Sequence, residues 1–228
     1  MTETLERTQD RQVAGLADRR TWTRFAYLLA TFPLGQFWFI ALVTLISVGA
    51  SLVIIWVGIP ILWFVFLLWR RGAEIERDFV AWGLGIEIET PYRPEPVGPL
   101  RGMWAVRLRD PATWRDLAYL LLLLPLGIVW FTLLVTGLAV PLSLIATPLT
   151  YRWWAPFSFA SEGWRWLIID SPGEALIAAA IGVGFLFLFP GLLRGMAAIH
   201  GAVAAALLGP TESARLNAEV QGLRASRG

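Results

Sequence analysis

The sequence contains no cysteine and no lysine, and His200 is its single histidine. Without cysteine the chain can form neither disulfides nor thiolate metal sites. One histidine cannot build a histidine metal cluster or a histidine-based catalytic triad within one chain. We therefore expect no enzyme activity, no metal site and no cofactor.

Charge is also scarce, since only 16% of the residues are charged and the net charge is +2, whereas 57% are hydrophobic. So small a basic excess argues against a nucleic-acid partner. A chain of 228 residues with this composition is more apolar than a soluble domain, so part of its surface is expected to contact lipid. The N-terminal segment lacks the apolar core and cleavage site of a removable signal peptide. The composition predicts an all-α integral membrane protein whose first partner is the lipid bilayer.

Long uncharged stretches indicate how many helices cross the membrane. The 45 residues between Arg24 and Arg70 carry no charge. This is too long for one helix across roughly 30 Å of hydrocarbon and suits two. We expect the break between these two helices at residues 47–51, where serine, glycine and alanine gather.

Two further spans are expected in the second half of the chain. One covers about residues 117–140 and ends before Pro141 and Pro148, because proline disfavours the continuation of a helix. The other covers residues 175–193 and is preceded by Ser-Pro-Gly-Glu at 171–174, a capping-box pattern. Four transmembrane helices result.

The arginines predict the orientation of these helices, because basic residues accumulate on the cytoplasmic side of a membrane. Five arginines precede the first span, eight lie at residues 70–115 and four follow residue 193. Only two lie between the third and fourth spans. Both termini and the middle loop of this multi-pass protein of the cell membrane are therefore expected in the cytoplasm.

An internal repeat relates the two halves of the chain. Residues 21–44 recur as residues 113–136, at an offset of 92, and 14 of the 24 positions are identical. Arg71-Gly72 corresponds to Arg194-Gly195 at an offset of 123. The difference of 31 residues indicates an insertion at about residues 145–174. We expect two parallel hairpins of one design, of which only the second carries extra sequence outside the cytoplasm.

Each hairpin is followed by a segment that resembles an interfacial helix, at residues 70–85 and 194–209. A proline-rich stretch separates the two repeats, and Asp110-Pro111 restarts a helix before the second. The expected segments are a cytoplasmic tail at 1–20, a first hairpin with its interfacial helix at 21–85, a linker at 86–112, a second hairpin at 113–209 and a C-terminal cytoplasmic helix at 210–228.

Three features in or beside the spans concern helix packing and not ligand binding. Gln36 predicts a hydrogen bond between helices. Gly191-x(3)-Gly195 matches the pattern of closely approaching membrane helices only in part, because the charged Arg194 lies between the glycines, and this argues against a close contact there. Gly182-x-Gly184 lacks the strand-turn-helix context of a dinucleotide site, so it also predicts packing. His200 is expected at the membrane interface.

The insertion holds the candidate signal or ligand region, an aromatic cluster with interspersed charge. One interpretation is a re-entrant segment whose aromatic rings rest among lipid headgroups, and the other is a pocket for an apolar, lipid-like or cationic ligand. The candidate residues are Trp153, Trp154, Phe157, Phe159, Glu162, Trp164, Trp166 and Asp170.

Three blocks of sequence together carry a family resemblance: RLRDPATWRDLAYLLLLLPLG, the preceding PYRPEPVG, and the tail RGMAAIHGAVAAALLGPTESARLNAEVQGLRASRG. Over about residues 20–228 the chain resembles the putative sensor domain at the N-terminus of many actinobacterial histidine kinases. The resemblance implies signal input to a two-component system. The phosphoacceptor helix and ATP-binding domain that usually follow this module are not in the sequence, so signalling by a standalone chain would need a histidine kinase or another signalling partner.

Leu216, Val220 and Leu223 are spaced as on one seam of a coiled coil, which leaves a parallel homodimer open. Our first hypothesis is a non-catalytic membrane sensor module that relays an outer or intramembrane signal to its C-terminal helix. The alternative is a membrane scaffold subunit of a transporter or lipid-handling complex.

Overall fold

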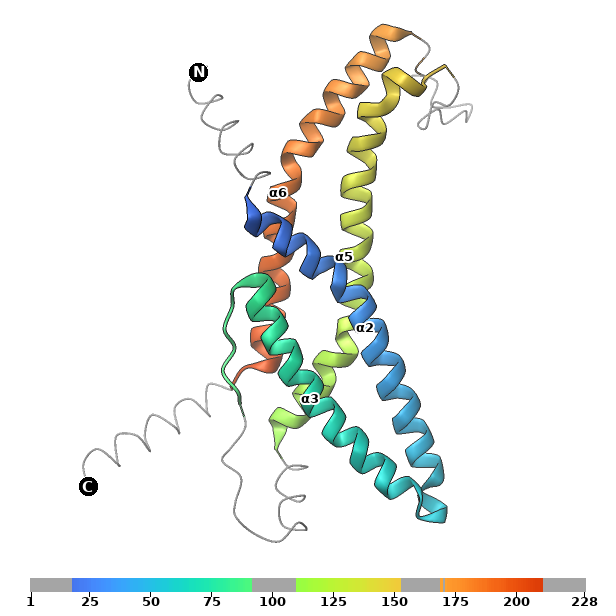
Figure 1. Cartoon of the computed structure of the whole chain (residues 1–228), viewed down its shortest axis with the longest axis vertical. Coiled ribbons are helices and arrows are strands. Elements are labelled where there is room, and N and C mark those ends of the chain that lie inside the picture. Colours follow the sequence, from blue (N-terminus) through green and yellow to red (C-terminus); the bar gives the residue numbers. More distant parts are fainter. Residues whose placement is uncertain (1–17, 92–109, 153–168, 170, 211–228) are drawn as a thin grey trace, which may run out of the picture. The chain divides into compact units, whose positions relative to one another are not determined.

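The computed structural model describes residues 18–91, 110–152, 169 and 171–210. Every regular element in these ranges is helical (Figure 1), which confirms the all-α class for this part of the chain. The elements are α2 (Arg19–Ser51), the short 3-10 helix η1 (Leu52–Ile55), α3 (Gly58–Leu84), α5 (Pro111–Thr150) and α6 (Pro172–Leu208).

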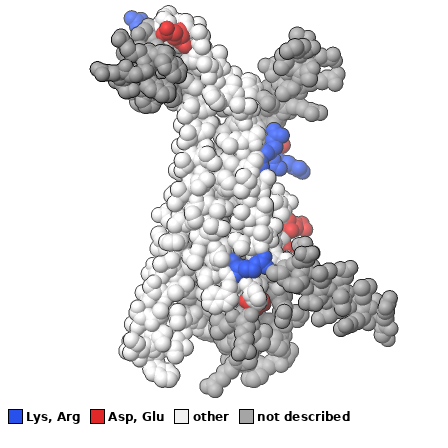
Figure 2. Space-filling view, turned by 180° about the vertical axis from the view of Figure 1, so that it is seen from behind, with Lys and Arg blue, Asp and Glu red and all other residues white. Residues whose placement is uncertain are grey.

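Three stretches of the described chain are long and apolar enough to cross a membrane: α2 together with η1, α5 and α6. On the face shown in Figure 2, uncharged residues make up most of the described surface and charged side chains gather in a few separate places. α3 does not qualify, because residues 70–78 include six charged residues. The membrane character is thereby supported, and the fourth span stays a prediction.

The helices contribute to two compact units. One combines residues 1–25 with 130–196, and the other combines residues 26–129 with 197–228. α2, α5 and α6 each pass from one unit into the other.

The break between α2 and α3 lies later than predicted. α2 continues through residues 47–51, where the Ser51 hydroxyl donates to the Ser47 carbonyl at 2.8 Å inside the helix. This bonding makes serine compatible with a helix interior. The chain reverses over η1, with Trp56 in the left-handed region at φ 63°. Gly58 follows, where a Cβ would overlap the Gly49 carbonyl, so the turn needs glycine.

α5 does not end before Pro141, as the sequence suggested, but continues through Pro141 and Pro148 to Thr150. A proline removes one backbone hydrogen bond, and in apolar surroundings a helix remains the best way to satisfy the other backbone groups. Thr150 also donates its hydroxyl to the carbonyl of Ala146 at 3.2 Å. Residues 145–150 of the predicted insertion are therefore helical.

α6 begins with the predicted capping box. The Ser171 amide donates to the Glu174 carboxylate and the Glu174 amide donates to the Ser171 hydroxyl, both at 3.2 Å. The helix then continues through Pro190 to Leu208. The expected interfacial helices are not separate elements, because each is the second half of one continuous helix, α3 or α6.

The two copies of the repeat meet where α2 crosses α5. A Cβ on Gly35 would lie 2.6 Å from the Leu123 backbone, and one on Gly127 would lie 2.7 Å from the Phe32 Cα atom. The glycines thus let the two backbones touch. Position 35 lies beside 123 and position 32 beside 127, so α2 and α5 run antiparallel here. The prediction of parallel hairpins is wrong at this contact, since a repeated sequence does not specify the direction in which its copies pack.

Repeat-equivalent residues supply much of the buried apolar surface. Their burial follows one face of α2 and the same face of α5, as expected for helical periodicity. The buried equivalent pairs are Tyr27 and Tyr119, Leu28 and Leu120, Trp38 and Trp130, and Leu42 and Leu134.

Candidate functional site

Two adjacent charged residues in the second half of α3 are turned inward. Glu76 is 1% exposed and Arg77 is 4% exposed, whereas Arg71 on the same helix is exposed. Buried charges are costly unless they are paired and hydrogen-bonded. Their partners therefore identify a candidate site.

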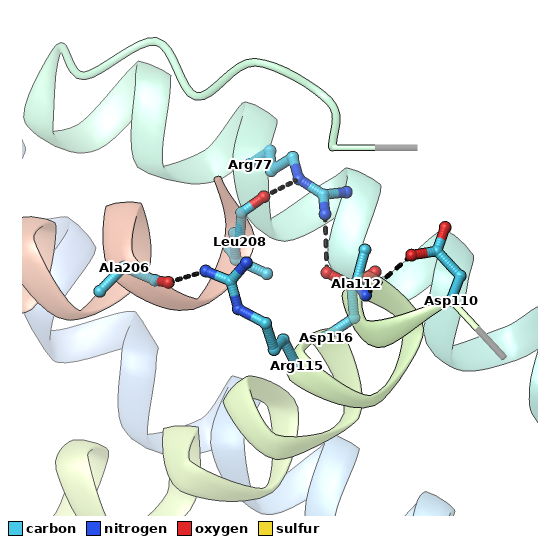
Figure 3. A network of polar contacts seen from close by, with 7 residues as sticks. All are labelled: Arg77, Asp110, Ala112, Arg115, Asp116, Ala206 and Leu208. Atoms are coloured by element: carbon cyan, nitrogen blue, oxygen red, sulfur yellow. Dashed lines mark hydrogen bonds and ion pairs between the residues drawn. The ribbon is translucent and has the colours of Figure 1, made fainter. Parts of the chain in front are cut away.

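Arg77 joins three helices. Its Nη2 donates to Oδ1 of Asp116 on α5 at 2.7 Å, and its Nε donates to the carbonyl of Leu208 at 3.1 Å (Figure 3). Asp116 is completely buried. Leu208 is the last residue of α6. We call Arg77, Asp116 and the Leu208 carbonyl the α6 clamp.

A second arginine reinforces the end of α6, because Arg115 donates to the carbonyl of Ala206 (Figure 3). The last carbonyls of a helix have no partner within the helix and carry partial negative charge, so cations there are favourable. Asp110 holds the start of α5 by accepting from the Ala112 amide at 3.0 Å. The start of α5 and the end of α6 are therefore held together at the point where the C-terminal segment leaves the described chain.

His200 is fully buried, so the prediction that it lies at the interface is wrong. Its Nε2 lies 2.7 Å from the hydroxyl of Tyr27 and 3.1 Å from that of Tyr119. These tyrosines are equivalent positions of the repeat, and they place α2, α5 and α6 around one imidazole. Their hydroxyls satisfy a polar group that would otherwise be buried at a cost.

Glu76 accepts a hydrogen bond from the Trp38 indole at 3.3 Å. Gly72, one turn earlier on α3, leaves room for the Trp38 ring, since a Cβ there would lie 2.7 Å from its Cη2 atom. Glu76 lies outside the three candidate spans. Burial raises the pKa of its carboxyl to about 7, although the bond from Trp38 opposes the shift.

This raised pKa predicts that the protein loses stability as the pH rises from about 4.5 to about 7. Over that interval the folded carboxyl keeps a proton that the unfolded one has released, so the slope of the unfolding free energy with pH is negative. Thermal unfolding in detergent across this range measures the effect. Glu76→Gln should remove much of the dependence, whereas Glu74→Gln, at an exposed ion pair with Arg71, should leave it unchanged. An unchanged profile in Glu76→Gln would contradict the assignment.

The glycines that the sequence singled out divide into two groups. Gly182 packs closely, since a Cβ there would lie 2.8 Å from the Pro141 carbonyl oxygen. Gly184, Gly191 and Gly195 have open space where a Cβ would stand, so they make no close contact within the described chain. The packing prediction is therefore confirmed for Gly182 alone.

Three further predictions concern Gln36, the insertion and the C-terminal seam. Gln36 is exposed and makes no hydrogen bond to any described residue, contrary to the expected bond between helices. The eight candidate residues of the insertion lie outside the described residues: Trp153, Trp154, Phe157, Phe159, Glu162, Trp164, Trp166 and Asp170. The C-terminal seam, Leu216, Val220 and Leu223, also lies outside them.

Sequence reasoning missed the α6 clamp because the charges on α3 fit an exposed interfacial helix equally well. One signal was present in the repeat itself. The first copy has Arg24 where the second has Asp116, in a block with 14 identities. A charge reversal within so similar a block indicates that Asp116 meets surroundings that the first copy does not share.

Comparison with known proteins gives one match. Residues 27–208 fit the sequence model of a family described as Putative sensor. This range begins at Tyr27 and ends at Leu208, so it includes His200 and both arginines that hold the end of α6. No curated protein and no solved structure matches the chain.

Proposed function

Because the chain belongs to the Putative sensor family, we propose that it is a non-catalytic membrane input module of a two-component-type signalling system. The observation that carries the proposal is the α6 clamp. In this proposal a signal shifts α3 or α5, the contact between Arg77 and the Leu208 carbonyl changes, and the segment after α6 passes the change to a kinase or another signalling partner.

The physical requirement for such a relay is an element with two discrete arrangements that the signal can bias. The last turn of α6 fits this requirement, because its carbonyls are held by side chains of α3 and α5 and not by the helix itself. A buried arginine that leaves one carbonyl must take another partner, which favours switching over gradual bending.

Gene deletion followed by complementation tests the function without knowledge of the ligand. We expect deletion to change a defined set of transcripts and the wild-type gene to restore it. Arg77→Lys should insert but restore it poorly, because an ammonium cannot reproduce the two directed bonds of the guanidinium. Arg71→Lys, at the exposed ion pair with Glu74, should restore it fully.

Two outcomes would oppose the proposal. One is equal complementation by both lysine variants at equal membrane abundance. The other is a deletion that alters uptake or lipid composition without a transcriptional change, together with co-purification of an ATPase in place of a kinase, which would favour the scaffold of a transporter or lipid-handling complex.

We also propose that the linker and the C-terminal segment face the cytoplasm, with the insertion on the opposite side. Single-cysteine labelling of the Cys-free chain in intact cells tests this with an impermeant maleimide. Val97→Cys should stay unlabelled and Ser161→Cys should react. The eight arginines at residues 70–115 and the four after residue 193 support this orientation.

A third cysteine, in Ile54→Cys, tests the antiparallel crossing. Ile46 on α2 lies with Trp114 on α5 around one cavity, so the turn that follows α2 lies at the end where α5 begins. We therefore expect residue 54 to be protected together with residue 97. In that case α2, α5 and α6 are the three spans, α3 does not cross the membrane, and α2 begins on the side of the insertion, contrary to the four spans and the cytoplasmic N-terminus expected from the sequence. Labelling of residue 54 from outside the cell would contradict the antiparallel crossing and would support the parallel hairpins that the repeat predicted.

A further inference from the structure

The buried carboxyl of Glu76 has few partners for a charged group. Within the described chain it receives one hydrogen bond, from the Trp38 indole nitrogen at 3.3 Å, and it forms no ion pair. Arg77 follows it directly in α3, but the guanidinium of Arg77 is bonded to Asp116 and Leu208 (Figure 3). A carboxylate offers about four acceptor positions, so this site suits the protonated form better than the charged one.

The groups that face Glu76 from the other helices are polar but do not neutralise a carboxylate. Tyr27 on α2 and Tyr119 on α5 lie close enough to interact electrostatically with Glu76. Both hydroxyls are bonded to the imidazole of His200 on α6. Asp116 on α5 is itself acidic and is paired with Arg77. Ionisation of Glu76 therefore adds a negative charge that no described residue neutralises through an ion pair.

The opposite face of the same helix borders water. Arg71 and Asp78 are seven residues apart, so they share one face of α3, and both are exposed. Charged side chains are costly in hydrocarbon, and this part of α3 lies outside the three candidate spans. A displacement of α3 toward that water would therefore hydrate the carboxylate of Glu76.

Such a displacement also acts on the α6 clamp. Glu76 and Arg77 are consecutive residues of one helix, so they move together. The Nη2 of Arg77 lies 2.7 Å from Oδ1 of Asp116, and its Nε lies 3.1 Å from the Leu208 carbonyl oxygen. Hydrogen bonds are lost beyond about 3.5 Å, so a small outward movement of α3 is enough to free the end of α6.

We propose that Glu76 is a proton-binding input site, at which α3 holds the end of α6 while the carboxyl is protonated and releases it when the carboxyl ionises. The step is a reversible exchange with water: the carboxyl O–H bond breaks, its electron pair stays on the carboxylate, and water takes the proton. This inference rests on the proposed signalling function and names the proton as its ligand. In the orientation proposed above, the proton is exchanged with the cytoplasm.

The raised pKa of Glu76 gives the direction and the size of the response. In the held state this pKa is about 7, and a carboxyl released into water returns to the ordinary value of 4.5. Protons therefore bind the held state more tightly, and the ratio of released to held molecules rises with pH between these two values. With both values, the ratio increases roughly twentyfold from about pH 5.5 to about pH 7.5.

Infrared difference spectroscopy tests the proton itself. The full chain in phosphatidylcholine nanodiscs is titrated over this pH interval. We expect the carbonyl band of a buried, protonated carboxyl to disappear as the pH rises. The band should be missing in Glu76→Gln at every pH. Glu74→Gln removes the partner of the exposed Arg71 and should keep the band.

Cysteine labelling in the same nanodiscs tests the release of α6. Ala204 lies near the end of α6 and is completely buried, whereas the neighbouring Ala205 is exposed. The ratio of the maleimide labelling rates of Ala204→Cys and Ala205→Cys corrects for the pH dependence of the thiol. We expect this ratio to rise at least tenfold over the interval. It should stay constant when Glu76→Gln is added, because glutamine still accepts from Trp38 but does not ionise.

A wild-type spectrum without the carboxyl band at the acid end would overturn the proton site. So would a labelling ratio that does not change with pH, or one that rises equally in Glu76→Gln, since Glu76 would then be only an acceptor for Trp38. Both measurements use the purified chain and need no transcriptional response. Failure of the proton site would therefore leave the complementation result intact, and failure of complementation would leave the titration intact.

Discussion

Arg77→Met is expected to lower the free energy of unfolding by about 3–5 kcal/mol, the usual cost when one partner of a buried ion pair is removed. Arg77 is 4% exposed and Asp116 is completely buried, so water cannot replace the lost guanidinium. Methionine preserves most of the side-chain length, which limits the packing loss. Thermal or denaturant-induced unfolding in detergent measures the change.

Arg71→Met is the matched control, because it removes an arginine from the same helix at an exposed ion pair with Glu74. Exposed pairs contribute about 0–1 kcal/mol, so this variant should unfold almost like the wild type. The double variant Arg77→Met with Asp116→Leu should recover much of the loss, since it leaves no buried charge without its partner. If Arg77→Met and Arg71→Met lower the free energy of unfolding by the same amount, the α6 clamp is not buried as described.

Gly35→Ala should destabilise the crossing of α2 and α5 by about 1–3 kcal/mol, the usual range for overpacking. The added Cβ would lie 2.6 Å from the Leu123 carbonyl carbon and oxygen, and a backbone cannot turn aside as a flexible side chain can. The two helices must therefore separate. Because Gly127 contacts the same crossing from the other helix, Gly35→Ala with Gly127→Ala should cost less than the sum of the two.

Gly184→Ala is the control for this pair, since nothing lies within 4 Å of a Cβ at that position. Alanine is the better helix former by about 1 kcal/mol in an exposed helix interior, so this change should be neutral or stabilising. The same substitution therefore has opposite expected signs at the two sites. Destabilisation of equal size at Gly35 and Gly184 would refute the close crossing.

The sequence alone does not predict which of the charged residues on α3 are buried. Arg71 and Arg77 belong to one charged run, yet one is exposed and the other buried. The difference depends on partners 39 and 131 positions away, Asp116 and Leu208. The same holds for His200, whose nearest polar partners are 173 and 81 positions away. The helical pattern alone places such residues on a face and leaves open what packs against that face.

By itself the sequence determined the apolar, helical class, the family resemblance and the local starts of helices at Asp110 and Ser171, because composition and capping depend on residues within one turn of each other. Only the tertiary structure decided that Pro141 stays inside a helix, that the repeats cross antiparallel, and that Arg77 holds the end of α6. Each of these outcomes depends on surroundings supplied by distant segments, which a local pattern does not specify.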